Sequence, residues 1–194
     1  MNNIMLDLET MGKGSNAAIV SIGAVFFNPL TGELGEKFYE RIWLESAEKY
    51  GEIDASTVVW WLGQSDEARS EINHDKSVGL KEALRGFSNF VIDNAEAFNK
   101  IRVWGNGCTF DNVILSNAYK SVELSKPWSY AGDMDVRTIV ELGRKLLNFD
   151  PKKDMPFEGE KHNALADAIH QAKYVSAIYQ KLAEATHRDE VNEA

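Results

Sequence analysis

The N-terminal part of the chain carries three strand signals in succession, and this succession constrains the fold more than any other feature. Ile4 to Leu8 is apolar around one acid, and Ala17 to Phe27 is a longer apolar run rich in β-branched residues. The segment from Asn28 to Gly32 contains Pro and Gly, which is typical of a hairpin turn, and it leads into a third strand over Lys37 to Trp43. We therefore expect the chain to open with a three-stranded meander.

After Gly79 the hydrophobic spacing changes from that of strands to that of helices. Apolar residues now lie three or four positions apart, which places them on one helix face; they are Leu80, Ala83, Leu84, Phe87 and Val91. The remaining predicted elements are a strand at Ile101–Trp104, helices after Asp111 and after Asp135, which could act as a cap, and a final helix over about Asn163–Leu182. Strands followed by helices in this way predict an α/β fold, with a mixed sheet flanked by helices.

Composition indicates one globular domain. The chain has 194 residues, of which 44% are hydrophobic and 26% charged, and no repeat or linker divides it. We expect residues 1–185 to form the domain and residues 186–194 a frayed acidic tail. The single cysteine, Cys108, excludes an internal disulfide and a cysteine-built zinc site. With no basic leader and no apolar run of about 18 residues, we expect a cytoplasmic protein that does not enter a membrane.

Net charge limits how the chain could bind a polyanion. The 21 basic and 30 acidic residues give a formal charge of −9, whereas broad capture of a phosphate backbone favours a positive surface. Attraction to nucleic acid would then come from bound cations and from a small basic cluster, formed by Arg137, Arg144, Lys145, Lys152, Lys153 and Lys161. The alternative is that these are ordinary solvated charges interleaved with acids.

The first candidate for chemistry is the pair Asp7 and Glu9 in the first strand. Residues two apart on a strand point to the same face, so the two carboxylates share one small volume while Leu6 and Leu8 face the other way. Desolvation and repulsion make this arrangement costly unless a hard cation such as Mg²⁺ or Mn²⁺ neutralises the pair. Taken alone, the two acids could also be solvated charges at a strand end.

Two further segments could add to this pair. Asn106 to Asp111 follows a predicted strand and opens a helix, where an isolated acid such as Asp111 can equally be a cap. His162 is the only one of the four histidines with an aspartate, Asp167, five residues on. Five helical steps would turn the two about 140° apart. They converge only if Asn163 caps the helix and His162 lies before it.

Taken together and in this order, the three motifs resemble those of the DEDD (DnaQ-like) exonuclease superfamily, in the branch with histidine in the third motif. The resemblance covers residues from about 4 to 180 and includes all five expected functional residues: Asp7, Glu9, Asp111, His162 and Asp167. It implies a ribonuclease H-like fold with a mixed five-stranded sheet between helices. It also implies 3′-to-5′ hydrolysis of single-stranded nucleic acid or 3′ overhangs, DNA or RNA, to 5′-mononucleotides.

The resemblance further implies a two-metal mechanism with Mg²⁺ or Mn²⁺. Two ions about 4 Å apart compensate the charge on the attacking and leaving oxygens of a phosphodiester. Asp7 is expected to bridge both ions, with Glu9 and Asp167 completing one site and Asp111 supporting the other. Histidine suits proton transfer at neutral pH, so His162 is expected to accept a proton from the attacking water.

Two segments give a closer likeness within the superfamily. Ser56–Trp61 and Asp135–Thr138 resemble a subgroup that includes a T-even phage exonuclease and RNase AS-like exoribonucleases of mycobacteria. This subgroup is split between DNA and RNA substrates. The likeness favours DNA slightly and leaves RNA open. Met11 departs from the threonine that many members carry there, which puts the contact with the terminal nucleotide in doubt.

Substrate contacts are expected from Thr10, Met11, Asn106, Trp61 and Arg137. Adjacent tryptophans on a helix lie about 100° apart, so one of Trp60 and Trp61 could stack on a base, or the two could form core packing or a homodimer seam. Arg137 could hold a phosphate or pair with Asp133 or Glu141. Two other functions stay open, a catalytically silent nucleic-acid-binding module, which would be expected to lack some of the acids, and a metal-dependent nucleotide phosphoesterase.

Overall fold

The computed structural model describes residues 1–72 and 74–192 and contains a five-stranded sheet in the order β3-β2-β1-β4-β5. The antiparallel meander is formed by β1 (Asn3–Thr10), β2 (Ile19–Phe27) and β3 (Leu34–Arg41). On the other side of β1, β4 (Arg102–Gly105) and β5 (Asp133–Asp135) are added in parallel. The predicted mixed five-stranded sheet is therefore confirmed.

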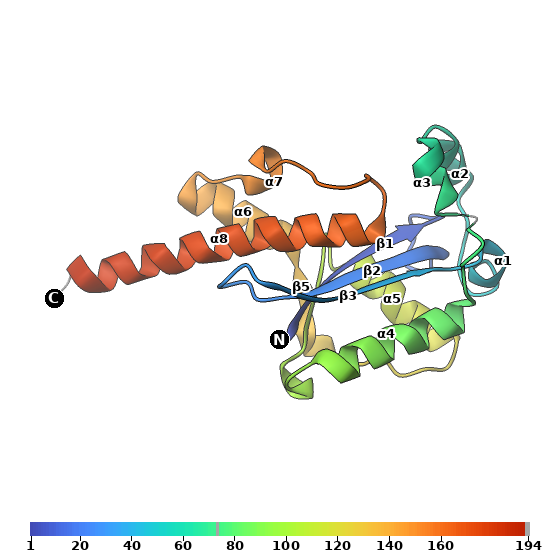
Figure 1. Ribbon diagram of the computed structural model, residues 1–194, viewed down its shortest axis with the longest axis horizontal. Helices are drawn as coiled ribbons and strands as arrows, with labels where there is room; N and C mark the ends of the chain where they lie inside the picture. Colours follow the sequence, from blue (N-terminus) through green and yellow to red (C-terminus); the bar gives the residue numbers. More distant parts are fainter. Residues whose placement is uncertain (73, 193–194) are drawn as a thin grey trace.

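Helices cover both faces of this sheet (Figure 1). One face carries α4 (Leu80–Asn94) and α5 (Asp111–Ser121), and the other carries α6 (Val136–Leu147) and the long α8 (Ala164–Asn192). Along β1, Ile4, Leu6 and Leu8 enter the core on the side of α4 and α5. Met5 packs with residues of α6 and α8 on the opposite side. Since Asp7 and Glu9 share the face of Met5, they point toward α8, as the alternation predicted.

Short helices connect the main elements. They are α1 (Leu44–Ala47), α2 (Ala55–Leu62), α3 (Asp66–Ser70) and α7 (Pro151–Asp154), with 3₁₀ turns at Phe98–Lys100 and Tyr130–Gly132. The α2–α3 segment lies beside the C-terminal end of β1, near the start of α8 (Figure 1). Sequence spacing did not predict these helices, because elements this short contain too few turns for a hydrophobic period.

Two elements differ from their predicted bounds. The strand β5 was not located from residue patterning, because its three residues are too few to show alternation. The final helix continues to Asn192 instead of ending near Leu182, since Ala183, Glu184 and Ala185 favour helix and no Gly or Pro interrupts them. Much of the predicted 186–194 tail is thus helical, and residues 193–194 lie outside the described residues. In the part of the chain that the structure describes, no helix is both long and apolar enough to cross a membrane.

Candidate active site

The acids of β1 lie where that strand loses its neighbour. β1 pairs with β4 only from Asn3 to Met5, so the edge of β1 beyond Met5 is free on that side. The backbone N–H of Leu8 uses this free edge to donate to Oδ1 of Asp111, at 3.3 Å. The segment after β4 thus brings Asp111 of the second motif into direct contact with β1, which carries the first motif.

Asp111 is buried at the first residue of α5, and a glycine makes this position accessible. A Cβ atom at Gly105, the last residue of β4, would lie 2.4 Å from Oδ1 of Asn112 and 3.0 Å from Cβ of Asp111. Only glycine leaves room for the helix to begin so close to the strand end. Asn112 secures the junction, because its Nδ2 donates to the carbonyl of Val103 at 2.9 Å.

The third motif converges because its histidine precedes the helix. Asn163 caps α8, with its Oδ1 accepting a hydrogen bond from the N–H of Ala166 at 3.0 Å. His162 has a left-handed backbone, with φ of 65°, and its N–H donates to Oδ2 of Asp167 at 3.0 Å. This is the geometry that the sequence required for His162 and Asp167 to meet.

Another glycine, not identified from sequence, places the start of α8 on the sheet. Gly23 of β2 is the direct partner of Asp7 in the antiparallel ladder. A Cβ atom at Gly23 would lie 2.1 Å from the carbonyl carbon of Ala164 and 2.2 Å from the backbone nitrogen of Leu165. The first turn of α8 therefore rests on bare backbone beside Asp7. A glycine inside an apolar strand run is the sequence signal for such a close approach.

Three of the acids meet closely. Carboxylate oxygens of Asp7, Glu9 and Asp167 lie within 4.8 Å of one another. Asp111 is outside this trio, but it faces the same pocket of about 240 Å³, which is lined by Asp7, Leu8, Glu9, Asn106, Phe110, Asp111, His162, Asp167 and Gln171. All five residues of the predicted motifs thus line one pocket, and they come from β1, α5 and the start of α8.

Burial and mutual repulsion shape the electrostatics of this pocket. Burial, together with the charges of Asp167 and Asp111, raises the pKa of Glu9 to about 8. Burial likewise raises the pKa of Asp111 to about 7, although the N–H of Leu8 opposes this. The pKa of Asp7 is also raised, first by burial and then by the neighbouring acids. Without a cation, each of these carboxyls therefore keeps its proton to a higher pH than an isolated carboxyl does.

These residues fit divalent cations. The donors are carboxylate oxygens, the ligands that Mg²⁺ and Mn²⁺ prefer. Among the described residues, no salt bridge reaches any of the four acids. The side chain that supports Asp7 is neutral: Nε2 of Gln171 donates to its Oδ1 at 2.7 Å. Gln171, one helical turn after Asp167, was not identified from sequence, because an isolated glutamine on a helix carries no motif signal.

The two adjacent tryptophans have different environments. Trp61 is 2% exposed, and its indole N–H donates to the carbonyl of Thr10 at 3.0 Å, so its ring belongs to the core. Trp60 is 44% exposed, and its ring centroid lies 4.9 Å from that of His162. The tryptophan available for stacking is therefore Trp60, whereas Trp61 had been expected to contact substrate. Met11 is also buried in the core.

A second hollow adjoins the acid pocket. It has a volume of about 400 Å³ and is lined by Leu8, Glu9, Thr10, Gly12, Lys13, Ser56, Thr57, Trp60 and Phe110. Leu8, Glu9 and Phe110 line both pockets. The Thr10 hydroxyl is already engaged, because it donates to the carbonyl of Gly12 at 2.9 Å. The indole of Trp60 is the largest aromatic side chain of this hollow.

Two basic side chains, those of Arg137 and Lys152, bond to Asn106 at the rim of the acid pocket. Nε of Arg137 donates to the carbonyl of Asn106 at 3.0 Å, and Nζ of Lys152 donates to its Oδ1 at 3.3 Å. The expected alternative partners of Arg137 are otherwise engaged, since Asp133 pairs with Lys126 and Glu141 with Lys145. Arg137 and Lys152 thus bring positive charge to one side of the acids.

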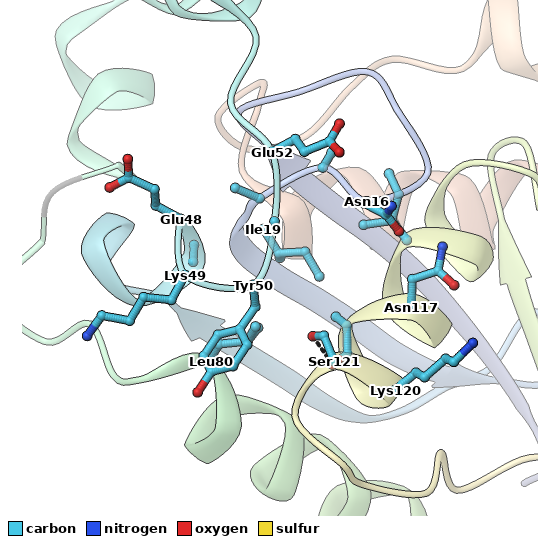
Figure 2. Close-up of a pocket in the computed structure, with 16 residues that line it drawn as sticks. Asn16, Ile19, Glu48, Lys49, Tyr50, Glu52, Leu80, Asn117, Lys120 and Ser121 are labelled. Atoms are coloured by element: carbon cyan, nitrogen blue, oxygen red, sulfur yellow. Dashed lines mark hydrogen bonds between the residues drawn. The ribbon is translucent and has the colours of Figure 1, made fainter.

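A larger cavity lies apart from the acids, between the loop that follows β1 and one side of α5 (Figure 2). Its volume is about 530 Å³. The two acids that line it, Glu48 and Glu52, point in different directions and do not form a pair (Figure 2). Size alone therefore does not identify the site. The close spacing of four carboxylates and their raised pKa values favour the smaller acid pocket.

Comparison with known proteins adds a family and a fold. The model of the 3′-5′ exoribonuclease Rv2179c-like domain matches residues 2–179. An exodeoxyribonuclease of Enterobacteria phage T4 is 28% identical over 165 residues, which cover 73% of this chain and 71% of the phage protein.

Solved structures share the fold at low identity. The nuclease domain of 3′hExo, a DEDDh family member bound to rAMP, has 13% identity and a TM-score of 0.65, with 92% of each chain covered. Exonuclease I of E. coli in complex with a dT13 oligonucleotide has 13% identity and a TM-score of 0.64, covering 96% of this chain and 42% of that one.

Proposed function

This chain belongs to the family of 3′-5′ exoribonuclease Rv2179c-like domains, and we propose that its four-acid pocket removes mononucleotides from the 3′ ends of single-stranded nucleic acid or of 3′ overhangs. One observation carries the proposal. Oxygens of Asp7, Glu9 and Asp167 lie within 4.8 Å of one another, and Asp111 faces the same pocket. A structural role alone would leave these closely spaced, mutually repelling acids without a compensating charge.

The acids divide into two groups that share Asp7. Asp7, Glu9 and Asp167 would hold one Mg²⁺ or Mn²⁺ ion, and Asp7 with Asp111 would hold a second. When bound, the two ions compensate negative charge on the attacking and leaving oxygens. The placement of Asp111 outside the close trio supports this division. Gln171 keeps Asp7 oriented by donating to one of its oxygens.

His162 is proposed to accept the proton of the attacking water. Its ring sits at the pocket wall against Trp60, and its backbone N–H is tied to Asp167. The residue is therefore joined to the acid cluster through its backbone, and its imidazole does not belong to the close trio of ligand atoms. After cleavage, the shortened strand keeps a free 3′ hydroxyl and the released nucleotide carries a 5′ phosphate.

The adjoining hollow is proposed to take the terminal nucleoside. It shares Leu8, Glu9 and Phe110 with the acid pocket, so a nucleoside there would place its phosphate next to the acids. The exposed face of Trp60 offers a stacking surface for the base. Arg137 and Lys152, on the other side, would attract a phosphate of the strand in an otherwise acidic protein.

Short 5′-labelled single strands of RNA and of DNA, incubated with the protein and Mg²⁺ or Mn²⁺, test the proposal. We expect a ladder that shortens from the 3′ end in steps of one nucleotide, and an Asp167→Ala control that produces none. Comparison of the two strands also identifies the preferred sugar. A catalytically silent module would bind these strands without shortening them. A nucleotide phosphoesterase would release phosphate from mononucleotides and leave the strands intact.

A further inference from the structure

The strand β3, which contributes nothing to the acid pocket, is in register with the acids. Tyr39 of β3 pairs with Gly23 of β2, and Gly23 pairs with Asp7 of β1. Residues paired across a sheet point to the same face, so Tyr39 and Asp7 flank the bare backbone on which α8 begins. The first turn of α8 therefore lies between the side chains of Asp7 and Tyr39.

Two residues further along these strands, a second residue of β3 lies in register with an acid of β1. Arg41 of β3 pairs with Ser21, and Ser21 pairs with Glu9. Arg41 binds Glu71, which follows α3 and is 5% exposed. Nε and Nη2 of Arg41 donate to the two carboxylate oxygens of Glu71 at 2.8 and 3.0 Å. The hydroxyl of Tyr39 also donates to Glu71. Glu71 is thus a buried acid outside the pocket, held by two residues of β3.

The amide of Asn163 connects this group to the third motif. Its Nδ2 donates to the hydroxyl oxygen of Tyr39 at 2.9 Å and lies 3.4 Å from Oε1 of Glu71. Its Oδ1 caps α8 through the N–H of Ala166. Both ends of the amide are therefore engaged, and its orientation follows from the partners, because a carboxylate can only accept.

The hydrogen bonds of Asn163 with Tyr39 and Glu71 form an anchor for the preceding residue, His162. His162 has a left-handed backbone, which is disfavoured for a residue with a side chain and persists where surrounding contacts fix it. The turn is held on one side by the bond from its N–H to Asp167. On the other side it is held by Asn163, through Tyr39 and Glu71.

We propose that Tyr39, Glu71 and Asn163 are positioning residues that hold the His162 imidazole at the acid pocket. This inference rests on the proposed function, because it assumes that His162 accepts the proton. None of the three lines the pocket, so their effect on turnover would pass through the turn at His162. Trp60 of α2 packs against the His162 ring, and Glu71, just after α3, bonds to the neighbouring Asn163.

Two substitutions break the anchor while sparing the helix cap. In Asn163→Ser, the hydroxyl can still cap α8, but the amide donor to Tyr39 and Glu71 is lost. We expect kcat on a single-stranded oligonucleotide to fall by on the order of 10- to 100-fold, the usual effect of misplacing a reacting group, with KM unchanged. Tyr39→Phe removes one hydroxyl and should lower kcat in the same direction by less, which gives a milder variant should Asn163→Ser melt early.

The control and the decisive comparison use nearby residues. Glu160, exposed in the same loop, accepts a hydrogen bond from the Ser65 hydroxyl at 3.4 Å, and Glu160→Ala should leave kcat unchanged. The single-turnover rate of the double variant His162→Ala/Asn163→Ser should equal that of His162→Ala alone, because the imidazole that the anchor positions is absent from both.

Additive losses in the double variant would overturn the inference, since they would mean that Asn163 acts only on the general structure. Wild-type kcat in both Asn163→Ser and Tyr39→Phe would overturn it as well, and would leave the proposed nuclease activity standing. If the wild-type protein shortened neither RNA nor DNA strands, the proposed function and this inference would both fail.

Discussion

Gly23 of β2 lies so close to the backbone of Ala164 that a Cβ atom there would come within 2.1 Å of the Ala164 carbonyl carbon. Because Gly23 is also the ladder partner of Asp7, this contact sets the height of α8, and of Asp167, above the first motif. The distance between two motifs that are far apart in sequence thus depends on a residue that belongs to neither.

Replacing this glycine should therefore disrupt both fold and site. In Gly23→Ala, α8 must move off the sheet, because the clash is with backbone that cannot rotate away. Overpacking of this kind typically costs about 1–3 kcal/mol. We expect a lower melting temperature together with weaker Mn²⁺ binding. Gly79→Ala is the control, since a Cβ there would be 3.6 Å from Oγ of Ser46, an ordinary contact. Unchanged Mn²⁺ affinity in Gly23→Ala would contradict the assigned role.

The two halves of the third motif should separate by experiment. Asp167→Ala should weaken divalent-ion binding and abolish hydrolysis together, because Asp167 belongs to the close trio of oxygen donors. His162→Ala should leave ion affinity nearly unchanged while slowing turnover by about 10²- to 10⁴-fold, the range for a positioned general base. Calorimetric Mn²⁺ titrations beside single-turnover rates measure both effects. If His162→Ala lost the ions as completely as Asp167→Ala, the histidine would be a ligand and not the base.

Stability without ions should fall as pH rises. The pKa of Glu9 is 4.5 for an isolated side chain and about 8 in the folded protein. Between these values the folded state retains a proton that the unfolded state has lost, so raising the pH favours unfolding over this window. Melting curves in a chelator should therefore shift downward from about pH 4.5 to about pH 8. Divalent ions at a hundred times their Kd should restore about 2.7 kcal/mol at neutral pH.

A neutral substitute isolates this effect. Glu9→Gln removes the titrating carboxylate, so its melting temperature in chelator at neutral pH should exceed that of the wild type. The same variant should gain less from Mg²⁺ or Mn²⁺, because one ligand is lost. A Glu9→Gln protein that melts below the wild type in chelator would show that Glu9 stabilises the fold and is not strained by its neighbours.

The adjacent tryptophans offer a matched pair of substitutions. Trp61→Ala should destabilise the protein by about 3–5 kcal/mol, because it empties a core position. Trp60→Ala should change the melting temperature little and weaken binding of single strands, by the roughly 1–3 kcal/mol that base stacking contributes. Thermal melts and fluorescence titrations with an oligonucleotide separate the two. Equal effects of both substitutions on binding would contradict base stacking on Trp60.

Local rules predicted a large part of the site. Alternation along β1 predicted that Asp7 and Glu9 share a face, and capping of the final helix by Asn163 was the condition under which His162 and Asp167 would meet. These relations involve neighbours in sequence, where backbone geometry alone sets which side chains share a face. The same logic separated the meander from the helices that follow it.

Long-range contacts could not be predicted in this way. The contact of Gly23 with Ala164, the bond from Gln171 to Asp7 and the anchor of Asn163 on Tyr39 each join residues far apart in the chain. Which of two adjacent tryptophans is buried depends on where α2 packs, and no local period encodes that in so short a helix. The sequence therefore predicted which acids would meet in one pocket, whereas the residues that hold them in place emerged from the fold.

Asp7, Glu9, Asp111 and Asp167 are proposed to form one centre for divalent ions. Anomalous scattering from crystals of the wild-type protein soaked in Mn²⁺ measures this most directly. We expect one peak within about 2.5 Å of carboxylate oxygens of Asp7, Glu9 and Asp167, and a second between Asp7 and Asp111. Saturating Mn²⁺ that leaves no peak beside Asp7, in protein that still shortens strands from the 3′ end, would contradict it.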